Sequence, residues 1–375
     1  MYVYILGAGA SKADGAPVTS EIFGAAFRNV NVERVDGSRR FVSTVSPFEG
    51  NPISEFLPVF ELFDKWERTR LAPKWSGLPK EIYTPLPHQV AVDTRRFGHF
   101  YSKLYRINRG LEPCDLTPEV MKDIWRKATW LFYHTIGSAG WHRECKYYQA
   151  FVERTLARPG VHCVISFNVD TLLDNCLYRL CCSFVPGTGV WERKKELEWT
   201  YGVEFGVRDG MREYEFRHDA KILYYKPHGS LHWGLSRETG QVSLHHPAES
   251  SNYEKLFLRQ DSNEDALVIL PIEEKELPLP LQGVWNGALD AMSRAEELFV
   301  IGYSAPDTDN REAAQLFGKA SASLKRVVIA NPCESNRQRI RDLLVNFGTG
   351  QVIEYHDFEE CLKREFEETC AAKEA

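Results

Sequence analysis

Asn168 and Asp170 are the first candidates for chemistry in this sequence. They follow residues 161–166, whose β-branched and apolar character predicts a buried strand. In an open α/β sheet, ligands bind in the crevice beyond the carboxyl ends of the strands, and we expect both side chains there. An amide and a carboxylate in that place suit ligand binding. They equally suit a role as caps of a helix predicted over residues 171–180.

His228 stands in the same place after another predicted strand, residues 221–225. A glycine follows it, which leaves space for a ligand to approach. A lone histidine is usually structural, and its place at the sheet edge is what favours a functional role. Nearby His232, His245 and His246 have no carboxylate or cysteine partner at helical spacing, so we expect no metal site.

Gly7, Ala8, Gly9 and Ser11 form a glycine turn directly after the first predicted strand. Such a turn lets backbone N–H groups face a pyrophosphate, and the next helix adds partial positive charge. Lys12 replaces the third glycine of a dinucleotide fingerprint, and no acidic residue ends a strand about 20 positions later, as in a typical dehydrogenase. A glycine turn without a ligand is the alternative.

A second glycine turn, with Gly302 and Ser304, ends a later predicted strand, and Asn331 ends the strand after that. Residues of these types suit phosphate groups and ribose hydroxyls. A plain turn and a helix cap have the same appearance in a sequence.

The elements that position these residues alternate between strands and helices in the last third of the chain. This alternation is typical of right-handed βαβ units in a parallel sheet. We therefore predict an α/β fold, a doubly wound Rossmann-like parallel sheet with a large helical insertion. The predicted strands are residues 2–6, 161–166, 221–225, 266–270, 298–302, 326–330 and 352–355.

The insertion is predicted where the strand pattern stops. Proline and tryptophan become frequent, helical periodicity appears at residues 54–66 and 120–136, and no pattern indicates a buried strand. We predict a single catalytic domain over residues 1–375. Its parts are Rossmann-like segments 1–30 and 158–362, a mainly helical insertion 31–157 and a short helical C-terminal tail 358–375.

Composition excludes several other classes of protein. A formal net charge of −6 gives no overall attraction to nucleic acid or anionic lipid. No stretch approaches the roughly 18 apolar residues of a transmembrane helix, and the opening residues indicate a strand and not a signal peptide. The 9 cysteines are odd in number and include no Cys-x-x-Cys pair. We expect a cytoplasmic protein without metal that binds neither membrane nor nucleic acid directly.

The order of these motifs is more specific than any one of them. Gly-Ala-Gly-Ala-Ser, a Gly-Ala-Pro that ends at Pro17, Phe-Asn-Val-Asp, Pro-His-Gly-Ser, Gly-Tyr-Ser and Ala-Asn follow one another along the chain. In this order the chain resembles the sirtuin family from residue 1 to about 360, apart from the insertion. The resemblance implies a Rossmann-like fold that takes NAD+ as its substrate.

Two features depart from the sirtuin deacylases. Those enzymes carry a four-cysteine zinc module soon after the His-Gly pair, whereas no cysteine lies between Cys182 and Cys333 in this chain. A long helical segment instead precedes Asn168, which resembles the bacterial sirtuin-like NADases of antiviral defence systems.

The resemblance also implies residue roles. Asn168 orders the attacking water and the ribose, and His228 contacts ribose hydroxyls and serves as general base, because an imidazole with its ordinary pKa of about 6.5 accepts protons at cellular pH. Asp170 accepts the N–H of the nicotinamide carboxamide. The other implied NAD+-binding residues are Gly7, Ala8, Gly9, Ser11, Gly302 and Ser304 at the pyrophosphate, Asn331 at the adenosine ribose, and Pro17.

The activity we expect is hydrolysis of the nicotinamide–ribose bond of NAD+ to nicotinamide and ADP-ribose, as an effector of bacterial anti-phage defence by NAD+ depletion. Nicotinamide leaves as a neutral molecule, so the enzyme needs no general acid. One alternative is an NAD-dependent protein deacylase, which the missing zinc cysteines disfavour. Another is a non-catalytic sensor of NAD or ADP-ribose derivatives, which the pair Asn168 and His228 disfavours.

Unregulated NAD+ depletion would kill the host, so we expect control of the site. The insertion is the segment that we expect to cover the crevice or form an oligomer interface. We expect a homo-oligomer and a separate activator or sensor protein, such as a HerA-type ATPase or an Argonaute-like protein. The tryptophans considered for the interface, with a plain helical core as the equal alternative for each, are Trp66, Trp75, Trp125, Trp130 and Trp141.

Overall fold

The structure is a computed structural model. It describes residues 1–18, 21, 30–35, 38–43, 55–63, 65–66, 97–140, 145–185, 190–193, 199–203, 205–208, 220–245, 263–272, 275–320, 322–345, 347–348 and 350–367. Trp75 and Trp141 lie outside these residues.

The chain divides into two compact units. The first comprises Met1–Val18, Ile136–Leu270 and Glu274–Ala375, and the second comprises Thr19–Thr135 with Pro271–Glu273. All residues proposed for the site belong to the first unit.

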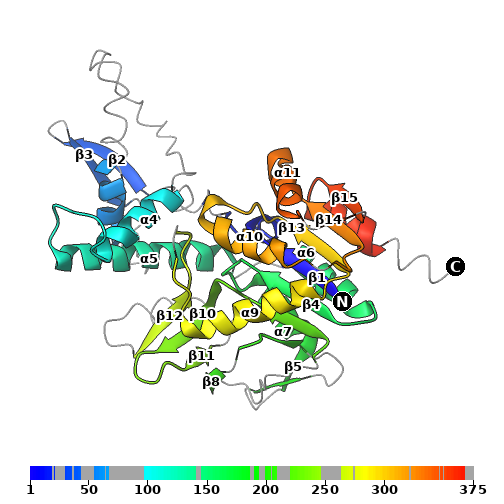
Figure 1. Ribbon diagram of the computed structural model, residues 1–375. Coiled ribbons are helices and arrows are strands. Elements are labelled where there is room, and N and C mark those ends of the chain that lie inside the picture. The colour runs from blue at the N-terminus through cyan, green and yellow to red at the C-terminus, as the bar shows by residue number, and fades with distance from the viewer. Residues whose placement is uncertain are drawn as a thin grey trace. The chain divides into compact units, whose positions relative to one another are not determined.

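A seven-stranded sheet in the order β15-β14-β13-β1-β4-β9-β7 forms the centre of the first unit, and Figure 1 shows β1 between β13 and β4. All of its strand pairs are parallel. Apart from the edge strand β7, the order corresponds to the 3-2-1-4-5-6 arrangement of the doubly wound dinucleotide-binding fold. The predicted fold class is therefore confirmed. The strands are β1 Tyr2–Leu6, β4 His162–Ser166, β7 Trp199–Thr200, β9 Ile222–Tyr225, β13 Glu297–Ile301, β14 Arg326–Ala330 and β15 Gln351–Tyr355.

Helices cover both faces of this sheet, which is why its central strands are continuous apolar runs. The helices α1, α6, α7 and α12 pack as one group, and α9, α10 and α11 pack as another against β9 and β14. Their bounds are α1 Ala8–Ala13, α6 Lys146–Ala157, α7 Leu172–Cys181, α9 Leu279–Ser293, α10 Asn310–Gly318, α11 Glu334–Leu343 and α12 Phe358–Leu362, with the π-helical turn η7 Lys363–Glu367 after α12.

Ala8, Gly9 and Ser11, which were predicted in a glycine turn, are helical. The helix α1 starts at Ala8, directly after the first strand, and ends at Ala13. Small residues allow this because they let the helix pack closely against the turn after β13.

A second sheet of four strands corrects one predicted strand. Residues 266–270 were expected in the parallel sheet, but β12 pairs antiparallel with β10 in a separate sheet of order β12-β10-β11-β8. Only one residue of β12 is fully buried, a pattern that suits a partly solvated antiparallel strand. The strands are β8 Phe205–Arg208, β10 Gly229–Ser236, β11 Val242–Leu244 and β12 Glu264–Val268, and a separate hairpin joins β5 Cys182–Val185 to β6 Val190–Arg193.

The second unit contains α4, most of α5, a helix at 55–63 and an antiparallel hairpin of β2 and β3. This hairpin was not predicted from the sequence. Trp125 and Trp130 pack at ring-centroid distances of 6.3 Å from Tyr101 and 5.3 Å from Phe56. Both tryptophans are partly exposed and contact aromatic residues of their own unit. The bounds are β2 Val30–Val35, β3 Ser38–Ser43, α4 Phe97–Asn108 and α5 Pro118–Gly140.

None of the described helices combines the length and apolar character needed to cross a bilayer. The helix α6, which lies within the predicted insertion, groups with the first unit.

Gly229 is where the chain passes from the first sheet into the second, and it allows a test of that junction. Its φ is +73° and an added Cβ would lie 1.9 Å from the Leu267 carbonyl oxygen, so Gly229→Ala must push β12 away. We expect a loss of about 3 kcal/mol or more in the free energy of unfolding.

Gly240→Ala is the matched control, because Gly240 has φ +67° with nothing within 4 Å of its added Cβ. The loss in the free energy of unfolding for Gly240→Ala measures only the cost of placing a side chain on a left-handed backbone, which is about 1–2 kcal/mol. Chemical denaturation measures the free energy of unfolding of both variants. Equal losses would show that the approach of β12 does not require glycine at position 229.

Candidate functional site

The loops after β1, β4, β9, β13 and β14 leave the parallel sheet at one edge, and nearly all the predicted site residues lie in these loops. The chain proceeds from β1 to β4 in one direction and from β13 to β14 in the other. The topological switch point therefore lies between β1 and β13, where doubly wound sheets bind their ligands.

Two glycine turns are packed against each other at the switch point. The N–H of Gly7 donates to Ile301 O at 3.0 Å, and the N–H of Gly9 donates to Gly302 O at 2.9 Å. A Cβ on Gly302 would lie 2.1 Å from the backbone nitrogen of Ala10. These glycines are thus needed for contact between two backbones. Because protein carbonyls accept from Gly7 and Gly9, these two N–H groups are not free donors for a pyrophosphate in this structure.

The Asn168 side chain is bound to the first glycine turn. Its Nδ2 donates to Gly7 O and to Ser11 Oγ, both at 2.8 Å, and the residue is 7% exposed. A carbonyl oxygen can only accept, so the atom facing Gly7 must be the amide nitrogen. Oδ1 therefore lies on the opposite side of the amide, away from Gly7.

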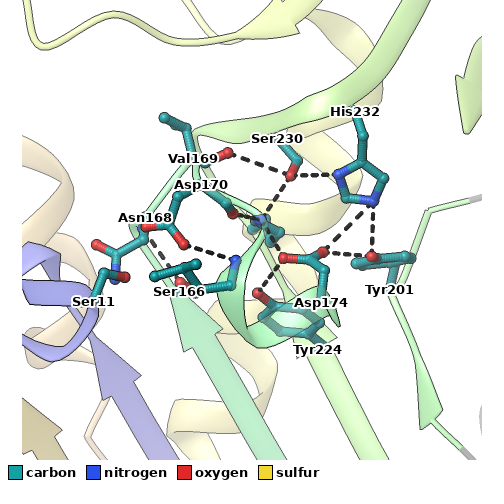
Figure 2. A network of polar contacts seen from close by, with 12 residues as sticks. Ser11, Ser166, Asn168, Val169, Asp170, Asp174, Tyr201, Tyr224, Ser230 and His232 are labelled. Atoms are coloured by element: carbon teal, nitrogen blue, oxygen red, sulfur yellow. Dashed lines mark hydrogen bonds and ion pairs between the residues drawn. The ribbon is translucent and has the colours of Figure 1, made fainter. Parts of the chain in front are cut away.

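Ser11 was predicted to hold the pyrophosphate, but its hydroxyl is buried against Asn168 and against Tyr148, whose phenol oxygen is 2.8 Å from Ser11 Oγ. Figure 2 shows Ser11 beside Asn168. In this position Ser11 orients the Asn168 amide.

Tyr148 and Asp14 complete this arrangement, and sequence analysis missed both. The Asp14 carboxylate accepts from the backbone N–H groups of Tyr147 at 2.9 Å and Tyr148 at 2.8 Å, in the first turn of α6. A helix N-terminus favours a carboxylate in this position. No local sequence signal joins Asp14 to residues 133 positions further along the chain.

Asp170 caps α7, as the structural alternative predicted. Its Oδ1 accepts from Leu172 N–H at 3.0 Å, and its backbone oxygen accepts from Lys226 Nζ at 2.6 Å. Burial raises the pKa of the Asp170 carboxyl, although the Lys226 charge and a hydrogen bond with Ser11 act against the shift. Asp170 is 7% exposed.

A buried ion pair beneath the Asn168 loop was also missed. Lys226 Nζ lies 2.8 Å from Asp174 Oδ2, and both side chains are 0% exposed. Tyr224 and Tyr201 donate their hydroxyls to the same carboxylate. Burial opposes ionisation of Asp174, but the Lys226 ammonium and the hydrogen bonds from Lys226 and Tyr201 hold its pKa below the ordinary value. Figure 2 shows the network around Asp174.

A second path through side chains joins Lys226 to Asp174. Lys226 Nζ donates to Ser230 Oγ at 2.6 Å, and Ser230 Oγ lies 2.9 Å from His232 Nδ1. His232 Nε2 lies 3.0 Å from the Tyr201 hydroxyl. Tyr201 donates in turn to Asp174. Ser230, His232 and Asp174 are all buried, so this Ser–His–Asp set is part of the packing beneath the Asn168 loop.

His228 lies at the same edge of the sheet and is buried, with 8% of its surface exposed. Its ring packs edge-on to Phe167, the residue before Asn168, with centroids 5.1 Å apart. Its Nε2 is buried without a hydrogen-bond partner and lies 3.6 Å from Asp309 Oδ1.

The electrostatics of His228 correct its predicted protonation behaviour. Burial, with the nearby Lys275 charge, lowers its pKa from 6.5 to about 4, although Asp309 and a backbone hydrogen bond with Phe167 act in the opposite direction. This pKa is below the ordinary value of about 6.5 that was assumed for a general base. The ring is neutral at cellular pH and accepts hydrogen bonds, but it is a weak proton acceptor.

The glycine after His228 also has a role other than the one expected. The space beside Gly229 is filled by the backbone of Leu267 in β12, and Ile269 N–H donates to His228 O at 2.8 Å. Gly229 therefore fixes the backbone of His228 against β12 and leaves no room there for a ligand.

Both polar atoms of the Asn331 side-chain amide form hydrogen bonds within the protein. Its Nδ2 donates to Tyr303 O at 3.3 Å, and its Oδ1 accepts from Cys333 N–H at 3.0 Å. It is 5% exposed and joins the loop after β14 to the turn after β13. Ala8, Pro17 and Ser304 are partly exposed at the same edge or just after α1.

The described residues contain no group of three or more His, Cys, Asp or Glu side chains placed to hold a metal ion.

Comparisons with known proteins give no family model and no curated protein that matches this chain. Solved Sir2 structures are similar to it. A Sir2 enzyme is 12% identical over 100% of this chain and 93% of its own, with a TM-score of 0.41. Sir2 with a p53 peptide and NAD+ is 13% identical over 99% and 94%, with a TM-score of 0.40.

A third Sir2 structure, a variant with a deacetylated p53 peptide and 3′-O-acetyl ADP-ribose, is 12% identical over 98% of this chain and 93% of its own, with a TM-score of 0.42. Because these TM-scores are low, the Rossmann class of this protein rests on the order and direction of its own strands.

The Lys226–Asp174 pair yields a prediction about stability. Lys226→Met leaves the Asp174 carboxylate buried and unpaired, and we expect a loss of about 3–5 kcal/mol in the free energy of unfolding. Asp174→Asn is expected to lower the free energy of unfolding as well, because it leaves the Lys226 ammonium buried without a counter-charge.

The double variant, Lys226→Met with Asp174→Asn, has neither buried charge. We expect its loss to be smaller than the sum of the two single losses by about 2 kcal/mol or more. Urea denaturation of the four proteins measures this coupling. Additive losses would show that the two charges do not stabilise each other.

Proposed function

We propose that this protein is an NAD+ glycohydrolase, which cleaves the nicotinamide–ribose bond at the switch-point edge of its sheet. The single observation that carries the proposal is the orientation of the Asn168 side-chain amide. Its nitrogen is bound to the Gly7 carbonyl at 2.8 Å, which directs Oδ1 away from the glycine turn. An amide oxygen so fixed can accept a hydrogen bond from water and orient it without neutralising a nearby cation.

The fold supports NAD+ as the substrate. A 3-2-1-4-5-6 strand order with glycine turns on both sides of the switch point is the arrangement that binds dinucleotides. The order of the motifs along the chain, which resembles that of sirtuins, supports the same substrate. His228 lies next to Phe167 at this edge, with a free lone pair for a ribose hydroxyl.

The reaction balances with water as the only other reactant. The C1′–N bond breaks with its electron pair moving into the pyridine ring, so nicotinamide leaves uncharged. The water oxygen bonds to C1′, and one proton is released to solvent. Asn168 holds the water and His228 holds the ribose, so the protein contributes mainly position and electrostatics.

Within this proposal the protein acts in bacterial defence against phage by NAD+ depletion, as a homo-oligomer under the control of a separate protein, of the HerA-type ATPase or Argonaute-like class. The compact second unit, residues 19–135, is large enough to carry such an interface. Light scattering of the purified chain tests for the oligomer, and a monomer at all concentrations would exclude it.

The proposed activity predicts that Asn168→Ala and His228→Ala each lower NAD+ turnover by about 10²- to 10⁴-fold. Both variants should remain folded, although Asn168→Ala loses buried hydrogen bonds worth about 1 kcal/mol each. Chromatographic measurement of nicotinamide and ADP-ribose released from NAD+ gives the rates.

His356→Ala is the matched control, because the His356 side chain is 70% exposed and lies outside the site. It should keep the wild-type rate. Turnover near the wild-type rate in either site variant would contradict the assignment. Products that form only with an acyl-lysine peptide, as an O-acyl ADP-ribose, would identify a deacylase instead.

The lowered pKa of His228 predicts the pH dependence of kcat/KM. The lone pair on Nε2 is present above the pKa of about 4 and is lost as the pH falls through it. Asp309 and Lys275 are the charged groups facing the ring. We expect a level rate from about pH 8 to 5.5 and a decline only below about pH 5. A decline centred near pH 6.5 would show that His228 titrates as an ordinary imidazole.

A further inference from the structure

We propose that Asp309 is a specificity-determining residue that binds, together with His228, the adjacent hydroxyls of a cis-diol on the nicotinamide-side ribose. This proposal rests on the proposed NAD+ glycohydrolase function and names a residue that the motif comparison did not supply.

The first observation is the unpartnered nitrogen of His228. The side chain is 10% exposed, and its Nε2 has no hydrogen-bond partner. Because Nε2 has no partner, the backbone hydrogen bond with Phe167 is assigned to Nδ1. On the neutral ring, Nε2 therefore presents a lone pair. A buried acceptor without a donor costs about 1–3 kcal/mol, so its persistence needs an explanation such as a ligand that supplies the donor.

The second observation is an aspartate at a helix N-cap that does not cap the helix. Asp309 precedes α10, but its side chain makes no capping hydrogen bond. The carboxylate instead contacts the Lys275 ammonium, and its Oδ2 accepts from the Tyr303 hydroxyl at 3.3 Å. A capping Asp in this position ordinarily stabilises the helix by about 1 kcal/mol. Asp309 makes no capping hydrogen bond and does not provide this stabilisation.

The backbone directs Asp309 toward His228. Gly302 has φ +63° and Ala305 has φ +47°, so two of four consecutive residues after β13 are left-handed. Ala305 is fully buried in this conformation, which side chains rarely adopt. These two bends lead into the short 3-10 helix η6, Asp307–Asp309, whose last residue is the one beside His228.

The two observations meet at a pair of acceptors. His228 Nε2 and Asp309 Oδ1 are 3.6 Å apart, too far for a hydrogen bond between them. A carboxylate has about four acceptor sites, so the contacts with Lys275 and Tyr303 leave some vacant. Two neighbouring acceptors can bind two neighbouring hydrogen-bond donors. The adjacent hydroxyls of a ribose cis-diol are such a pair of donors.

Lys275 has a supporting role. Its side chain is 1% exposed and pairs with Asp309, which keeps the carboxylate ionised although burial opposes this. Burial would raise the pKa of Asp309, but the Lys275 charge and the hydrogen bonds from Lys275 and Tyr303 hold it below its ordinary value. An ionised carboxylate is the better acceptor for a hydroxyl.

The test compares the binding of ADP-ribose, which has the terminal ribose, with that of ADP, which lacks it. We expect Asp309→Asn to weaken ADP-ribose binding by about 10- to 100-fold, because its amide can donate to His228 and block the diol. ADP should bind equally to wild type and variant. Isothermal titration calorimetry measures all four affinities without turnover.

Asp307→Asn is the matched control, since Asp307 lies on the same 3-10 helix with a side chain 69% exposed. It should leave both affinities unchanged. Unchanged ADP-ribose binding by Asp309→Asn would overturn the inference, and so would an equal loss for ADP. If wild type binds neither ADP-ribose nor NAD+, the proposed function itself fails.

A ligand-side measurement applies if Asp309→Asn does not fold. Wild type is titrated with NAD+ and with an analogue whose nicotinamide ribose lacks the 3′-hydroxyl. We expect the analogue to bind about 10-fold or more weakly, because one buried acceptor is then left without a donor. Equal affinities would show that the diol is not recognised, with water satisfying the two acceptors instead.

Discussion

The site depends on direct contact between two backbone turns, those after β1 and β13. At this point a Cβ on Gly7 would lie 2.5 Å from the Cα of Tyr303, so no side chain fits between the turns. The contact fixes the Gly7 carbonyl, which sets the direction of the Asn168 amide. It also fixes the start of the segment that leads through Ala305 to Asp309. Both sides of the proposed site thus depend on one pair of glycine turns at the topological switch point.

Buried polar groups then hold the remaining residues in place. The Lys226–Asp174 pair lies under the loop that carries Asn168, and Lys226 also binds the backbone oxygen of Asp170. A buried ion pair is seldom a net gain in stability, but breaking it is costly, so it fixes one geometry. Lys275 and Asp309 repeat this arrangement beside His228. Two buried cations thereby constrain the two loops that we propose to meet the substrate.

Sequence patterns predicted the fold well because the central strands are buried on both faces. Continuous apolar runs such as residues 298–302 and 326–330 have few other structural solutions. The strand predicted at residues 266–270 was assigned to the wrong sheet, because pairing partners are not visible in a single segment. The hairpin at residues 30–43 was missed for the same reason.

The candidate residues were found from their place at strand ends, but their environments were not. A sequence cannot show that Asp14 reaches Tyr148, or that Ser11 turns inward to Asn168, because these contacts join distant segments. The lowered pKa of His228 likewise arises from burial and from Lys275, which lies far along the chain. The glycine beside His228 suggested space for a ligand, whereas β12 fills that space.

The most direct test of the account is a crystal structure of the Asn168→Ala protein with NAD+, because the substrate should bind without being cleaved. The account predicts the pyrophosphate beyond the turns after β1 and β13, and the nicotinamide ribose beside His228, facing the place of the lost amide. NAD+ bound at another part of the surface, or no binding at millimolar NAD+ to a folded protein, would contradict it.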